Sequence, residues 1–126
     1  MSEKDFEKLV SDAIAELPEN IRKIINNIAI TVERRPTPEQ LKKTGLRRDD
    51  FLLGLYEGVP LTTWGRGFGM VLPDKITIFQ DSIENFAQTS QDIKKMASEV
   101  VWHEVAHHFG FGEKEVRKLE RRRKSR

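Results

Sequence analysis

The chain has 126 residues, of which 22 are Lys or Arg and 20 are Asp or Glu, and its formal net charge is +2. This length suits one domain over residues 1–126, and the absence of cysteine excludes disulfide scaffolds, thiolate metal sites and thiol catalysis. No apolar run approaches the roughly 18 residues of a membrane span, and the N-terminal residues lack the basic and apolar pattern of a signal peptide. We therefore expect a cytoplasmic protein with no membrane partner.

The first third of the chain predicts two helices and a strand. Apolar residues at three- and four-residue spacing, with Ser2 as N-cap, predict a helix that ends near Glu16. A shorter helix is expected over 19–26. Ile and Val alternate with smaller or polar residues over 28–33, which predicts a half-buried strand.

The middle of the chain predicts short elements joined by loops. Thr37 and Gln40 have the spacing of a capping box and predict a short helical turn. Residues 45–50 are polar and predict a loop. The apolar segment 51–56 predicts a short strand, and 76–79 predicts a second and clearer strand.

The last third predicts the longest helix of the chain, over 91–109. Ser90 is its expected N-cap, and Gly110 stands where glycine adopts the left-handed conformation at low cost. A basic helix or tail is expected over 114–126. This order of elements predicts an α+β domain with a small sheet packed on a central helix.

Basic residues concentrate at the C-terminal end. Residues 114–126 contain eight basic and two acidic side chains, whereas residues 1–113 contain 14 basic and 18 acidic ones. A basic run can contact nucleic acid, but a solvated helix end whose cations suit the helix dipole is the more common arrangement. Nucleic acid is therefore a minor alternative partner, and the sequence predicts no oligomeric state.

All three histidines lie within six residues of the predicted long helix, in the pattern His103-Glu104-x-x-His107 with one further His. Residues four apart lie on one face of a helix, so His103 and His107 can bind one zinc ion. Glu104 lies to one side of that pair. From there its carboxylate can reach a water beside the metal without binding the metal itself.

The two histidines continue an apolar stripe formed by Ile93, Met96 and Val100, so we expect the pair on a face that is directed inward. The other side of the helix is also largely apolar, which is typical of a central, covered helix. Ordinary polar residues on a buried helix are the alternative interpretation. Two histidines at this spacing with Glu between them favour the metal site.

A catalytic zinc needs a third protein ligand and an open position. The extended pattern His-Glu-x-x-His-x-x-Gly-x-x-Glu has metzincin spacing, with Glu113 in place of the third His. Gly110 would end the helix and return the chain toward the metal. Glu115 and Glu120 remain alternatives, and Glu113 could instead serve as a first-turn acid of the final helix. His108 is off the stripe, so we expect a surface or supporting group rather than a ligand.

Three segments resemble a family of small, mostly prokaryotic zincin-like metallopeptidases, namely 103–110, 53–61 and 72–79. The resemblance implies a minimal zincin fold with one zinc ion, an acidic third ligand (here Glu113) and a peptide or protein substrate of unknown identity. The chain is less similar to true metzincins, because Met70 and Met96 both precede Glu113 and cannot form their downstream Met-turn.

The predicted activity is zinc-dependent peptide hydrolysis, with Glu104 as catalytic base and then acid. Tyr56 and Arg66 are candidates for oxyanion stabilisation. The stretch 64–72 has alternate glycines and either pairs with an extended substrate or forms an ordinary loop.

Two other classes of function stay open. A zinc hydrolase acting on RNA would use the basic tail, but the endoribonuclease family of that kind differs at the position of Glu104. In a non-catalytic, metal-stabilised binding module, Glu104 would be dispensable and the histidines would still support folding.

Overall fold

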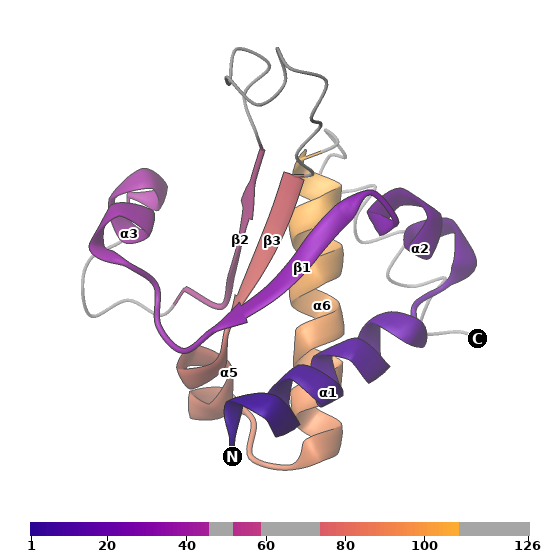
Figure 1. Cartoon of the computed structure of the whole chain (residues 1–126), viewed down its shortest axis with the longest axis horizontal. Helices are drawn as coiled ribbons and strands as arrows, with labels where there is room; N and C mark the ends of the chain where they lie inside the picture. Colours follow the sequence, from indigo (N-terminus) through magenta and orange to yellow (C-terminus); the bar gives the residue numbers. More distant parts are fainter. Residues whose placement is uncertain (46–51, 59–73, 109–126) are drawn as a thin grey trace.

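Three strands and five helices make up the part of the chain that the computed structural model describes, which is residues 1–45, 52–58 and 74–108 (Figure 1). In chain order the elements are α1 (Glu3–Ala15), α2 (Glu19–Ile25), β1 (Ile28–Glu33), α3 (Pro38–Thr44), β2 (Gly54–Glu57), β3 (Asp74–Phe79), α5 (Gln80–Phe86) and α6 (Ser90–His108). The predicted α+β class is confirmed.

The sheet has the strand order β1-β3-β2, so β3 is central and the other two strands are its edges. β1 pairs with β3 in parallel, and Thr31 lies opposite Thr77, with their hydroxyl oxygens 3.2 Å apart. β2 pairs with β3 in the antiparallel sense. Ile76 and Ile78 of the central strand are fully buried, which is expected of a strand that has neighbours on both sides.

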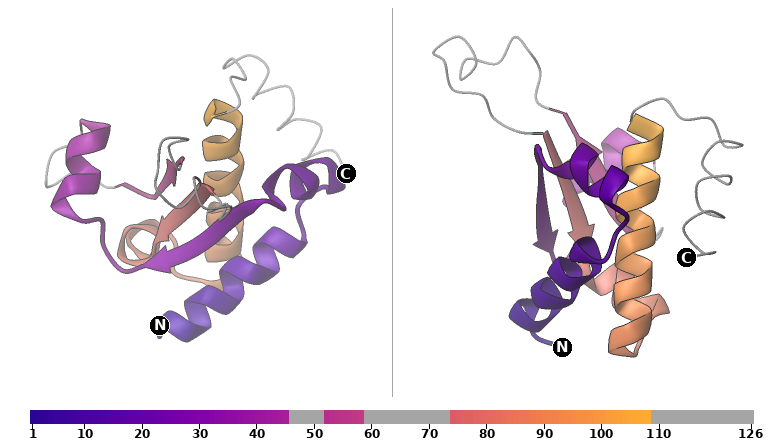
Figure 2. Two further views of the ribbon diagram at one scale, coloured as in Figure 1. Left: turned by 45° about the horizontal axis from the view of Figure 1, so that its top comes forward. Right: turned by 90° about the vertical axis from the view of Figure 1, so that its right-hand side faces the viewer.

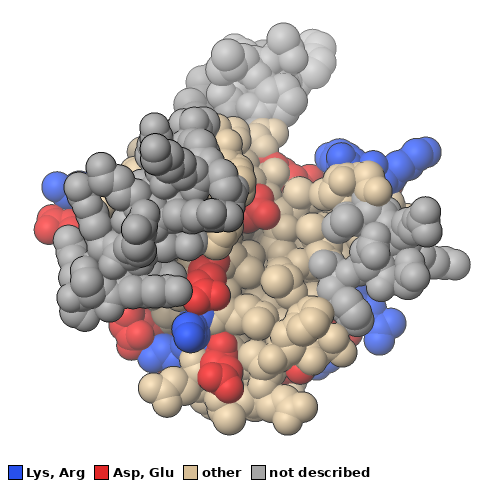
Figure 3. All heavy atoms as spheres, turned by 180° about the vertical axis from the view of Figure 1, so that it is seen from behind, with Lys and Arg blue, Asp and Glu red and all other residues tan. Residues whose placement is uncertain are grey.

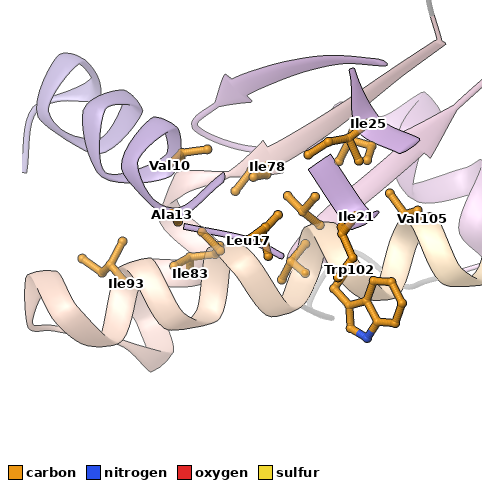
Figure 4. Packing of buried hydrophobic residues seen from close by; sticks show 14 of the residues in the cluster. Val10, Ala13, Leu17, Ile21, Ile25, Ile78, Ile83, Ile93, Trp102 and Val105 are labelled. Carbon is orange, nitrogen blue, oxygen red and sulfur yellow. The ribbon is translucent and has the colours of Figure 1, made fainter. Parts of the chain in front are cut away.

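Helix α6 lies along one side of the sheet and contacts β2, β3 and α1 (Figure 2). Figure 4 shows apolar side chains of α1, α2, β3 and α6 meeting in one cluster, and Trp102 and Val105 of α6 are part of it. Each large side chain buried in this way contributes roughly 1.5–3 kcal/mol of hydrophobic stabilisation. The prediction of a central, covered helix is therefore correct.

The predicted helix starts of α1 and α3 are confirmed by their caps. The hydroxyl of Ser2 accepts the N–H of Asp5 at 3.1 Å. Thr37 and Gln40 form a complete capping box, with a backbone N–H bonded to a side-chain oxygen in both directions. The element is a seven-residue helix rather than a single turn, and it ends at Gly45, whose φ of 73° is left-handed.

The structure corrects three details of the sequence prediction. α6 begins at Ser90, and the hydroxyl of Thr89, not that of Ser90, accepts the N–H of Asp92 at 3.1 Å. The strand expected over 51–56 is Gly54–Glu57. Helix α5 was not predicted, because it follows β3 directly and has no side-chain N-cap. Tertiary contacts support α5 instead, including a hydrogen bond from the Gln80 amide to the carbonyl of Met1 at 2.9 Å.

The predicted helix end at Gly110 and the basic segment 114–126 lie outside the described residues. None of the helices in the described ranges is long and apolar enough to cross a membrane.

Candidate metal and catalytic site

His103 and His107 lie one turn apart near the C-terminal end of α6. Their ring centres are 6.2 Å apart and the rings are tilted by 36°. Two imidazoles bound to one tetrahedral zinc at about 2.1 Å have ring centres roughly 5–5.5 Å apart. The observed separation is wider than this by about 1 Å, so the two rings would have to move closer together to share a metal. His103 is half-buried and His107 is exposed. The expectation that both histidines face inward is therefore met by His103 only, because the helix face that carries the pair becomes exposed at His107.

The backbone of α6 orients the His103 ring. Its Nδ1 lies 3.0 Å from the carbonyl oxygen of Glu99, one turn earlier. Because a carbonyl can only accept, Nδ1 carries the hydrogen in this bond, and in the neutral ring Nε2 then has a lone pair. A metal-binding histidine commonly has its second nitrogen fixed in this way, so the donor chemistry of His103 suits zinc.

Glu104 is half-buried, and its carboxylate Oε2 accepts the backbone N–H of Tyr56 at 3.3 Å. Burial raises the pKa of Glu104 above its ordinary value, although the Tyr56 N–H and the two neighbouring histidines act in the opposite direction. A raised pKa brings a carboxylate closer to the working range of a general base that must later return its proton as an acid.

The hydrogen bond to Glu104 comes from the free edge of the sheet. The carbonyl of Leu53 accepts the N–H of Phe79 at 3.0 Å, and in an antiparallel pair the residues alternate between facing their partner strand and facing away. Gly54 and Tyr56 therefore direct their backbone N–H and C=O groups away from β3. Helix α6 covers that edge and brings Glu104 to it.

Close packing of α6 on β2 depends on Gly54. A Cβ atom added at this position would overlap the Cγ1 of Val100 on α6 and would come within 3.2 Å of the carbonyl oxygen of Thr77. Only glycine lets the strand approach the helix this closely.

The side chain of Tyr56 is held by two further residues that the sequence did not connect with it. Its hydroxyl donates to Oδ2 of Asp74 at 2.8 Å, and its ring stacks on His108 with ring centres 3.7 Å apart. Nε2 of His108 also lies 3.9 Å from the same Asp74 oxygen. Burial, and then the hydrogen bond to Asp74 and its charge, raise the pKa of Tyr56 to about 12. The pairing of β2 with β3 brings Asp74 to Tyr56, and the packing of α6 against β2 brings His108 there, so the sequence offers no local signal for either contact.

A groove with a volume of about 410 Å³ runs from the start of β2 along α6 to the candidate site. Its apolar wall comes from the side chains of Leu52, Leu53, Met96 and Val100, and it is also lined by Gly54, Glu99, His103 and Glu104.

His103, Glu104 and His107 lie near one end of α6, and His108 stacks on Tyr56. In the described ranges, no group of three or more His, Cys, Asp or Glu residues is arranged to hold a metal. Glu113 and the alternatives Glu115 and Glu120 lie outside these ranges. The oxyanion candidate Arg66 and the stretch 64–72 also lie outside them.

Comparison with known proteins agrees with this architecture. Residues 25–123 match the sequence profile of a family described as zincin-like metallopeptidases. The fold resembles that of a conserved hypothetical protein from Thermus thermophilus, with a TM-score of 0.56 and 22% sequence identity over 86% of this chain and 94% of that chain. No curated protein matches the chain. The family match spans most of the chain, including the His-Glu-x-x-His motif, and the chain belongs to the zincin-like metallopeptidases.

Proposed function

We propose that this chain is a zinc-dependent peptidase in which His103, His107 and Glu113 bind the metal and Glu104 is the catalytic base. The observation that carries the proposal is the position of Glu104. Its carboxylate lies one residue from a metal-ligand candidate, next to the free edge of β2, and is held there by the N–H of Tyr56. A structural metal site would need the two histidines but no buried carboxylate at this edge.

A bound zinc ion would polarise the peptide carbonyl and lower the pKa of water toward ~7. The proton transfers of the reaction would be carried out by a residue of this chain. Glu104 accepts a proton from the attacking water and passes it to the leaving amine. Its raised pKa suits both steps, because the carboxyl group must gain and then lose a proton in each cycle.

The groove along α6 supplies a place for the substrate. Helix α6 covers the outer edge of β2 at Gly54 and Tyr56, and the Tyr56 N–H is already bonded to Glu104, so the substrate lies in the groove rather than adding to β2 as a further strand. The groove extends from Leu52 and Leu53 along α6 to His103 and Glu104. A peptide laid there would pass Glu104 and the two histidines.

The test combines metal analysis with activity. The purified protein is analysed for zinc before chelation, after chelation and after zinc add-back, and each sample is assayed with a fluorescent casein. We expect about one zinc per chain, with proteolysis lost on chelation and restored by zinc. Glu104→Ala should keep the zinc and lose activity, whereas His103→Ala should lose both.

Three results would contradict the proposal. Failure to take up zinc after add-back would show that the histidine pair is not a metal site. Zinc binding with unchanged proteolysis in Glu104→Ala would show that Glu104 is not the base, and zinc binding with no hydrolysis of any peptide would favour the metal-stabilised binding module.

A further inference from the structure

The groove along α6 has one polar side chain besides the candidate catalytic residues, and that side chain is Glu99. Glu99 is half-buried and lies one helical turn before His103. Its carbonyl oxygen accepts from His103, but its carboxylate has no hydrogen-bond or ion-pair partner among the residues that the structure describes. Glu99 also lines a second hollow together with Lys94 and Lys95, but neither lysine forms a described ion pair with it, so its carboxylate can pair with a cationic ligand.

The rest of the groove wall suits an aliphatic chain. Leu52 and Leu53, which directly precede β2, line one side of it, and Met96 and Val100 line it from α6. Among the described residues that line the groove there is no Lys or Arg. Figure 3 shows the molecule from behind, where several acidic side chains are set into a largely uncharged surface. The groove therefore combines an apolar wall with negative charge.

The spacing along the helix sets the length of a matching side chain. Glu99 and His103 are four residues apart, which is about 6 Å along a helix axis. Lys and Arg side chains carry three or four methylene groups before a cationic tip and routinely cover apolar surface while the tip reaches a polar partner. An acidic side chain would meet the charges of Glu99 and Glu104, and a purely apolar one would cover the Glu99 carboxylate without pairing it.

We infer that this groove binds an arginine or lysine side chain next to the cleaved bond, with Glu99 as the residue that selects the cation. The inference rests on the proposed peptidase function and names its substrate class. The stem of the substrate side chain lies against Met96 and Val100, and its guanidinium or ammonium group pairs with the Glu99 carboxylate.

The first test measures binding without catalysis. The chain has three methionines, Met1, Met70 and Met96, so labelling the methionine methyl groups with carbon-13 gives three signals, and Met96→Leu identifies the one in the groove. N-acetyl-arginine amide is titrated into the protein and compared with the norleucine and glutamate analogues. We expect the arginine probe to shift the Met96 signal with an affinity on the order of tenfold above that of the norleucine probe, and the glutamate probe to have no effect.

The matched variants are Glu99→Gln and Asp92→Asn. Both remove one negative charge from α6, but Asp92 is exposed and does not line this groove. Glu99→Gln should bring the arginine and norleucine probes to within twofold of each other, while Asp92→Asn should keep the preference. An equal response to the arginine and norleucine probes in the unmodified protein, or a preference that survives Glu99→Gln, overturns the inference.

The second test measures hydrolysis by the zinc-loaded enzyme. Internally quenched peptides of one sequence carry Arg, norleucine or Glu at a single central position, and mass spectrometry identifies the cleaved bond. We expect kcat/KM for the Arg peptide to exceed that for the norleucine peptide on the order of tenfold, with cleavage next to Arg, and Glu99→Gln to remove this difference. Hydrolysis without the preference overturns the inference alone, whereas zinc loading with no hydrolysis of any peptide overturns the proposed function and the substrate class with it.

Discussion

The backbone N–H of Tyr56 lies 3.3 Å from the carboxylate of Glu104 and donates a hydrogen bond to it. This bond joins the helix that carries the candidate metal ligands to the free edge of the sheet. It also fixes one carboxylate oxygen of the proposed base, so the orientation of Glu104 depends on how β2 packs against α6. The residues around this bond lead to four testable predictions, which concern zinc binding, packing, and the ionisation of Tyr56 and of Glu57.

The three histidines should differ in their effect on zinc binding. His103 and His107 are the candidate ligands, whereas His108 stacks on the Tyr56 ring at 3.7 Å. His103→Ala and His107→Ala should each lower zinc content well below one per chain, because a site that loses one of three protein ligands binds zinc weakly. His108→Ala is the matched control and should keep about one zinc. Loss of zinc in His108→Ala, with retention in His107→Ala, would reassign the second ligand to His108.

Gly54 and Val100 should show strong energetic coupling. Gly54→Ala forces a methyl group into the Val100 side chain and should lower the free energy of unfolding by about 1–3 kcal/mol. Val100→Ala alone should cost about 1–2 kcal/mol through lost burial, but it removes the clash, so the double variant should be more stable than the sum of the single effects. Gly58→Ala is the control, because a Cβ there makes only ordinary contact with Asp74 at 3.6 Å. Strict additivity in urea denaturation would refute the predicted overlap.

Tyr56 should ionise at unusually high pH. It is the single tyrosine of the chain, so the near-ultraviolet absorbance of the phenolate reports on this residue alone. We expect a midpoint near the folded pKa of about 12, compared with 10.0 for an ordinary tyrosine. Because the folded pKa is raised, the stabilising contribution is complete below pH 10 and is lost as the pH rises through about 12. Asp74→Asn should lower the midpoint, because Asp74 supplies both the acceptor and a nearby negative charge. Circular dichroism recorded in parallel separates this titration from unfolding, and a midpoint near 10 in the folded protein would contradict the prediction.

Glu57 should contribute to stability at neutral pH and not in acid. Its carboxylate accepts from the Gln40 amide at 3.1 Å and from Lys43 at 3.3 Å, which joins α3 to β2. Burial acts to raise the pKa of Glu57, but these hydrogen bonds and nearby lysines bring the pKa below its ordinary value.

Because the folded pKa of Glu57 is lowered, its stabilising contribution is complete above pH 4.5 and is lost as the pH falls through the folded pKa. Glu57→Gln should therefore lower the free energy of unfolding at pH 7 by about 0.5–1 kcal/mol, and the difference should vanish in acid. Glu7→Gln, which removes the same charge from the exposed surface of α1, should change stability little at any pH. An effect of Glu57→Gln that is constant with pH would show that the contact does not depend on ionisation.

The sequence by itself determined the features that depend on neighbours within a few residues. Helical spacing placed His103 and His107 on one face, and the capping residues Ser2, Thr37 and Gln40 marked two helix starts correctly. The period-two pattern predicted β1. Each of these rests on backbone geometry that repeats over three or four residues, so the chain carries the information locally.

Only the tertiary structure decided which groups meet at the candidate site. Tyr56 is 48 residues from Glu104 and 18 residues from Asp74 along the chain, yet it contacts both. The close contact between Gly54 and Val100 likewise arises where β2 and α6 pack together. The groove that Glu99 lines lies at the same place. Helix α5 also depends on distant contacts, because it lacks a side-chain cap of its own. The physical reason is the same in each case: strand order, register and the approach of helix to sheet result from burying the shared apolar core, and no local pattern in the sequence encodes them.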